Sequence, residues 1–174
     1  RYQLKKERTE VTLGSVTIEE AELSDLGKQI KDISDLKDRL ISLPITKVLN
    51  ILIAGALKIK ASDIHFEPHE HDVKLRIRVD GIMREAMQFP KWVQGPVVSR
   101  IKIMANMDIA ERRVSQDGRI KVRLGGKGLD LRVSTLPTQY GEKVVMRVLD
   151  PNAASLDLDS VGLGKEARAR ILDI

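Results

Sequence analysis

The chain of 174 residues contains no cysteine, few aromatic residues and no long hydrophobic run. The absence of cysteine excludes disulfides and cysteine-ligated zinc. Aromatic residues make up only 3% of the chain and hydrophobic residues 42%, so the core has to be built from Ile, Leu, Val, Ala and Met. The longest apolar run, Val48–Leu57, contains Asn50 and is too short to span a bilayer. We therefore expect a soluble protein with an aliphatic core.

The charge balance is basic, with 30 Lys and Arg against 25 Asp and Glu and a net charge of +5. Such a balance is compatible with nucleic acid, anionic lipid, nucleotide or an acidic protein as a partner. It is equally compatible with an ordinary solvated surface. The length favours one domain with room for linkers.

Three predicted strands follow residue 118, because apolar and polar residues alternate there with a period of two. The residues expected to face the core are Ile120, Val122, Leu124, Leu129, Leu131, Val133, Val144, Met146 and Val148. Gly125–Gly128 joins the first two strands. It predicts a hairpin turn rather than a phosphate loop, because it links strand to strand and offers no helix N-terminus.

The preceding residues predict two helices and three further strands. Pro44 suits a first helical turn, and Phe89-Pro90 is expected to open a helical stretch that Gly95-Pro96 breaks. The predicted elements are a helix at Ile45–Lys60, strands at Ile64–Glu67, Val73–Val79 and Ile82–Met87, and a helix at Val97–Met107. This order favours an α+β fold, with helices packed on one face of an antiparallel sheet of about six strands.

The two ends of the chain differ in composition from the middle. Residues 1–40 are charged and weakly periodic, and predict a linker or arm with short amphipathic helices, one of them around Ile18–Leu26. Residues 41–150 form the predicted domain. Residues 151–174 predict a second linker that ends in a short helix at Lys165–Ile171.

A basic face is predicted on the side of the sheet opposite the core. It collects Lys74, Arg76, Arg78, Arg119, Lys121, Arg123, Arg132 and Arg147. Like charges across neighbouring strands repel, so such a face needs solvent, acidic neighbours or an anion. Arg132 and Arg147 each lie in the middle of a mostly apolar or small-residue strand. The planar guanidinium suits phosphate oxygens, although a solvated surface remains the alternative.

Three histidines, His65, His69 and His71, lie close together in sequence with Glu67 and Glu70 among them. Such residues can bind a transition metal. Their spacing matches no zinc template, and we expect a structural or domain-contact role and no metal site.

Four motifs carry a family resemblance. They are S-D-I-H-F-E-P at Ser62–Pro68, R-V-D-G at Arg78–Gly81, Q-D-G-R at Gln116–Arg119 and G-E-K-V-V-M-R at Gly141–Arg147. In this order they resemble the PAS-like N-terminal domain of the ATPases of type II secretion and type IV pilus assembly, the E-type traffic ATPases. The motifs do not separate the two systems.

The resemblance implies a domain that precedes a RecA-like motor, because no G-x-x-x-x-G-K-[ST] phosphate loop occurs in the chain. It implies a homohexameric parent that uses ATP and Mg²⁺, while this chain alone is not an enzyme. Arg132 and Arg147 would act on the nucleotide as arginine fingers do, and Arg119 and Arg78 are weaker candidates for the ATP phosphates.

The resemblance also implies partners and a location. The partners are the RecA-like domain of the same or a neighbouring subunit and inner-membrane platform proteins, so the protein would be cytoplasmic and peripheral on the inner membrane. Two alternatives stay open. A PAS-like ligand sensor would need a pocket in its core. A nucleic-acid-binding module would use aromatic platforms on exposed strand positions; the predicted hairpins have none, and we expect no nucleic acid.

Overall fold

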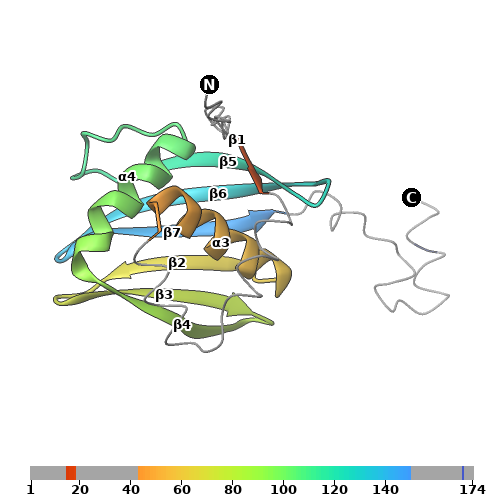
Figure 1. The fold of residues 1–174 in the computed structure, drawn as a ribbon, viewed down its shortest axis with the longest axis horizontal. Helices are drawn as coiled ribbons and strands as arrows, with labels where there is room; N and C mark the ends of the chain where they lie inside the picture. The colour runs from red at the N-terminus through yellow and green to blue at the C-terminus, as the bar shows by residue number, and fades with distance from the viewer. Residues whose placement is uncertain (1–14, 19–42, 150–169, 171–174) are drawn as a thin grey trace, which may run out of the picture.

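The computed structural model describes residues 15–18, 43–149 and Arg170. Within these residues a seven-stranded mixed sheet has the order β1-β5-β6-β7-β2-β3-β4. Helices α3 and α4 lie on one face of the sheet (Figure 1). The rest of the predicted arm and, apart from Arg170, the linker at 151–174 with its helix at Lys165–Ile171 lie outside the described residues.

The sheet is antiparallel except at one edge. Its strands are β1 (Ser15–Ile18), β2 (Asp63–Pro68), β3 (Asp72–Val79), β4 (Ile82–Pro90), β5 (Gln116–Leu124), β6 (Lys127–Thr138) and β7 (Gly141–Leu149). The predicted antiparallel sheet of about six strands is therefore wrong at β1, which pairs parallel with β5. Ile18 was expected on an amphipathic helix but is buried in the core. The four residues of β1 are too few to show a strand-like alternation in the sequence. Their strand conformation depends on pairing with β5.

The residues of β5, β6 and β7 that were predicted to face the core do face it. Ile120, Val122, Leu131, Val133 and Met146 are buried beneath the helices, with Val144 beside them. Leu124, Leu129 and Val148 face the same way but are only half-buried, because they lie toward strand ends. Gly125-Gly126 forms the predicted hairpin turn, and both residues have positive φ, a conformation that glycine adopts without strain.

Helix α3 (Ile45–Lys58) begins after Pro44, as predicted, and ends two residues earlier than expected. Its buried side includes Leu49, Ile53 and Ala54, which are fully covered. Because Pro44 provides no side-chain hydrogen bond to cap the N-terminus, α3 is stabilised by the packing of these residues rather than by capping.

Helix α4 (Gln94–Met104) follows a short 3₁₀ turn, η1 (Lys91–Val93). The prediction that Gly95-Pro96 breaks the helix is wrong. Both residues lie in its first turn, where proline removes no intrahelical hydrogen bond. Phe89 does not open a helix either: it belongs to β4, is buried and stacks against Phe66. The helix ends before Asn106, whose φ is 57°.

One charged pair lies beneath α4. Lys102 is 1% exposed, and its Nζ lies 2.5 Å from Glu142 Oε1 on β7. The same ammonium donates a hydrogen bond to the Glu111 carbonyl in the loop that leads to β5. This pair therefore links α4, β7 and that loop. No helix within the described ranges is long and apolar enough to cross a membrane.

Candidate anion-binding site

One row of charged residues crosses five adjacent strands on the face of the sheet that the helices leave open. Arg119 on β5 lies opposite Arg132 on β6, and Arg132 lies opposite Arg147 on β7. Asp63 on β2 then lies between Arg147 and Arg78 on β3. Neighbouring strands are about 4.8 Å apart, so four arginines and one aspartate stand in a single line.

Asp63 supplies the one negative charge of this row and is shared by two of its arginines. Its Oδ1 accepts a hydrogen bond from Arg147 Nε at 2.9 Å, and its Oδ2 lies 3.2 Å from Arg78 Nε. Ser62 Oγ donates to the same Oδ2 at 2.9 Å. Burial alone would raise the pKa of Asp63, but the hydrogen bonds from Arg147 and Ser62 and the two positive charges hold that pKa below its ordinary value. The carboxylate therefore stays ionised.

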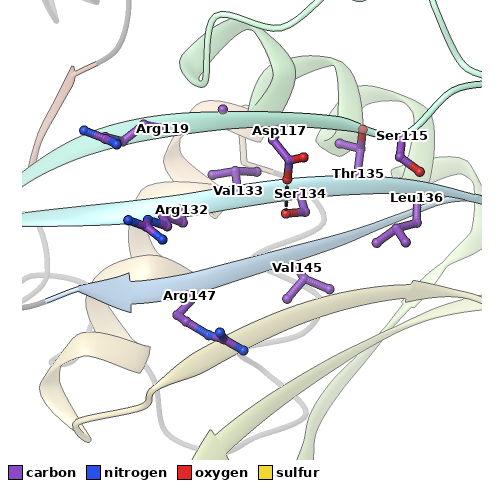
Figure 2. A pocket seen from close by; sticks show the side chains of 11 residues that line it. Ser115, Asp117, Arg119, Arg132, Val133, Ser134, Thr135, Leu136, Val145 and Arg147 are labelled. Carbon is purple, nitrogen blue, oxygen red and sulfur yellow. Dashed lines mark hydrogen bonds between the residues drawn. The ribbon is translucent and has the colours of Figure 1, made fainter.

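The other end of the row carries uncompensated positive charge. Neither Arg119 nor Arg132 makes an ion pair with any residue that the structure describes, and the Arg132 side chain is exposed. Together with Arg147 they border an open cavity of about 810 Å³ (Figure 2). The cavity is completed by Ser115, Asp117, Gly118, Val133, Ser134, Thr135, Leu136 and Val145.

The end of the cavity away from the arginines is lined by polar and apolar residues and contains no cation. Ser134 Oγ donates a hydrogen bond to Asp117 Oδ1 at 2.5 Å, which Figure 2 shows as a dashed line. The Asp117 carboxylate repels anions from that end. A phosphate group in the cavity is therefore most favourable over the guanidinium groups, where positive charge and bidentate donors coincide.

A second cluster of charged residues, centred on Glu67 further along the same face of β2, is paired within itself. Glu67 Oε1 lies 2.8 Å from Lys143 Nζ, Glu67 Oε2 lies 3.3 Å from Arg76 Nη1, and His65 Nδ1 lies 3.3 Å from Glu67 Oε1. Although burial raises the pKa of Glu67, its contacts with Lys143, His65 and Arg76 lower that pKa to about 2. Lys74 is paired with Glu85 at 3.1 Å. The predicted basic face thus divides into a neutralised half on β2 to β4 and an arginine-rich half on β5 to β7.

The predicted site residues are distributed across this division. Arg132 and Arg147 occupy opposed positions on β6 and β7, and Arg119 borders the same cavity. Arg78 does not line the cavity: its Nη1 donates to the Gly81 carbonyl at 3.0 Å and its Nε lies against Asp63. Sequence reasoning did not single out Asp63 as a site residue. Its parity with His65 and Glu67 on β2 was the available signal that it faces the basic side.

The remaining candidates do not form a second site. His65 lies on β2, whereas His69 and His71 belong to the β2–β3 turn region, and His71 is highly exposed. The described residues contain no group of three or more His, Asp or Glu placed to hold a metal ion. A small apolar groove of about 110 Å³, bordered by α3, Phe89 and Trp92, lies away from the arginine row.

Comparison with known proteins places the chain in a family. Residues 39–174 match the family described as type II/IV secretion system protein. The chain is 45% identical over 144 residues to type II secretion system protein E of Klebsiella pneumoniae. The alignment covers 83% of this chain and 29% of that protein. It is 43% identical over 143 residues to the type IV pilus assembly ATPase PilB of Myxococcus xanthus. That alignment covers 82% of this chain and 25% of PilB.

The chain therefore spans less than a third of the length of these relatives. Among solved structures, the Legionella pneumophila ATPase DotB aligns with 68% of this chain and 32% of its own, at a TM-score of 0.41 and 11% identity. Because that structural likeness is slight, the assignment rests on the sequence matches. They show that this chain belongs to the type II/IV secretion system protein family.

Proposed function

We propose that this chain is the non-motor domain of a secretion or pilus-assembly ATPase and that it contributes Arg132 and Arg147 to the nucleotide site of a RecA-like domain. The observation that carries the proposal is the row of arginines across β5, β6 and β7, whose charge the described residues compensate only at Arg147. Relatives named as a type II secretion system protein E and a pilus assembly ATPase support it.

The chemistry of the row suits phosphoryl transfer. Negative charge spreads over the oxygens of the transferred group in the transition state, and fixed guanidinium groups stabilise it. Arg119 is the third candidate for a phosphate contact, since it lines the same cavity as Arg132 and Arg147. Arg78 does not contact the phosphate in this proposal and acts only indirectly, as a partner of Asp63.

The assembly that this role requires is a homohexamer in which the open face meets a RecA-like domain of the same or a neighbouring subunit. ATP and Mg²⁺ would bind to that domain, and closure of the two domains would be transmitted to inner-membrane platform proteins during pilus or pseudopilus assembly. The protein would act in the cytoplasm, attached to the inner membrane through these partners.

Steady-state ATPase assays of the full-length hexamer test the proposed role. Arg132→Ala or Arg147→Ala should lower kcat about a hundredfold or more, with a much smaller change in KM, because an arginine finger acts mainly on the transition state. Lysine at either position should restore activity only partly, since a point charge cannot make a two-pronged contact. Arg123→Ala, which removes an exposed cation at the second outward-facing position after Arg119 on β5, is the matched control and should leave kcat unchanged.

Size-exclusion chromatography of each variant should show an intact hexamer. Full activity in the Arg132→Ala/Arg147→Ala double variant would refute the arginine role. The chain alone should bind ATP weakly and show no turnover, since its sequence contains no Walker A loop. Hydrolysis by the chain that survives further purification would contradict that expectation.

A further inference from the structure

Asp63 has two arginine partners that are held very differently. Arg78 makes a second contact, from its Nη1 to the Gly81 carbonyl, and is 39% exposed. Arg147 is 67% exposed and meets Asp63 through Nε alone, at 2.9 Å. Its two terminal amino groups make no hydrogen bond within the described residues. Arg147 thus makes the shorter contact with the carboxylate but has no other partner among the described residues, whereas Arg78 is also anchored on the Gly81 carbonyl.

The direction of the Arg147 side chain fits this difference. Figure 2 shows the side chain running from β7 toward β2, whereas Arg132 lies along β6. Two guanidinium groups on opposed positions repel each other, and Asp63 draws one of them aside. A phosphate group between Arg132 and Arg147 would reverse this balance, because it offers oxygens to both arginines at once.

We propose that Asp63 is an internal competitor for the anion site: it holds Arg147 while the site is empty and yields it when a phosphate group binds over Arg132. This inference deepens the proposed function and rests on it. Asp63 is a positioning residue here, because it acts on the ligand through Arg147. The ligand class is a phosphate group such as that of a nucleoside triphosphate.

Release of Arg147 leaves Asp63 satisfied. The carboxylate is only 8% exposed, and a buried charge without a partner is strongly destabilising. It retains Arg78 Nε at 3.2 Å and the Ser62 hydroxyl at 2.9 Å, both on Oδ2. Arg147 occupies the other oxygen, Oδ1. Release of Arg147 therefore breaks one ion pair with a largely exposed arginine and leaves no buried charge without a partner.

Glu67 provides a matched control for Asp63. It lies on the same strand and face, its side chain is 15% exposed, and its partners are Lys143, Arg76 and His65 rather than Arg147. None of these three partners lines the cavity. Glu67→Gln removes the same amount of charge as Asp63→Asn without freeing a cavity arginine, so it separates a specific competition from a general change in electrostatic potential.

The experiment is a titration of this chain with pyrophosphate at fixed ionic strength, followed by ¹⁵N NMR of the arginine Nε–H groups. Asp63→Asn should tighten binding roughly threefold to tenfold, the size expected when one opposing charge is removed near a protein surface. Glu67→Gln should change affinity less than about twofold. In an Arg147→Ala background, Asp63→Asn should no longer tighten binding. In the wild-type chain, pyrophosphate should shift the Arg147 Nε–H resonance and leave that of Arg78 in place.

Three outcomes would overturn the inference. They are equal or weaker pyrophosphate binding by Asp63→Asn, the same tightening in the Arg147→Ala background, and a wild-type Arg147 Nε–H resonance that does not move. The last readout needs no substitution, so it decides the matter even if Asp63→Asn unfolds. Failure of the proposed function looks different: Arg132→Ala and Arg147→Ala would then leave pyrophosphate affinity unchanged, and the double variant would keep full ATPase activity in the hexamer.

Discussion

The buried pair of Lys102 and Glu142 allows a quantitative prediction about stability. The Lys102 side chain is 1% exposed and that of Glu142 8%, with Nζ and Oε1 2.5 Å apart. Lys102→Met keeps the aliphatic stem and removes the charge, so Glu142 loses its cation. Glu142→Gln keeps the shape of the side chain and leaves an ammonium group with the Glu111 carbonyl as its remaining partner.

Each single change should destabilise the fold by about 3–5 kcal/mol, the usual cost of leaving one member of a buried ion pair without the other. A domain of this size is stabilised by about 5–15 kcal/mol in total, so either loss would take a large part of the stability. The double variant Lys102→Met/Glu142→Gln leaves no buried charge without a partner and should therefore lose clearly less than the sum of the two single losses.

Urea unfolding followed by far-UV circular dichroism measures these differences, provided that the slope of free energy against urea is the same for all variants. The exposed pair of Lys74 and Glu85, with side chains 30% and 43% exposed, is the control. Removing either partner there should cost less than about 1 kcal/mol. Single variants of the buried pair that cost as little as these, or a double variant whose loss is the sum of the two single losses, would refute the reasoning.

Three further predictions concern the core, the pH response and a close contact. Leu75→Ala should cost about 2–4 kcal/mol in urea unfolding by leaving a cavity, whereas Arg123→Ala should cost well under 1 kcal/mol; equal losses would contradict the assignment of the two faces. Glu67 has its pKa lowered from 4.5 to about 2, so its contribution is fully present above about pH 4.5 and is lost as the pH falls toward 2. Glu67→Gln should flatten that part of the curve of unfolding free energy against pH, and an unchanged slope would speak against the contacts of Glu67. Gly118→Ala should lower the melting temperature, because the added Cβ would lie 2.5 Å from the Ala105 carbonyl oxygen. An unchanged melting temperature would contradict a tight contact between β5 and the end of α4.

Local patterns in the sequence were sufficient for the faces of β5, β6 and β7 and for the position of α3. Alternation of apolar and charged residues depends only on the pleat of the strand, so Ile120 inward and Arg119 outward follow before any partner is known. The glycines at Gly125-Gly126 are likewise a local signal, because the hairpin turn needs positive φ. The four motifs, the last of which ends at Arg147, indicated the family that the sequence matches show.

Only the tertiary structure decided which of the charges meet. β2 lies between β7 and β3, and this strand order brings Asp63 beside Arg147, 84 residues away in the chain. Nothing local specifies that pairing, because a shift of two residues between strands would preserve every buried face and still place Asp63 opposite a different residue. The same registers align Arg119, Arg132 and Arg147 in one row and place Glu67, further along β2, beside Lys143 and Arg76. The sequence alone thus predicted a basic face, and the register of five strands determined where on it the positive charge remains available to an anion.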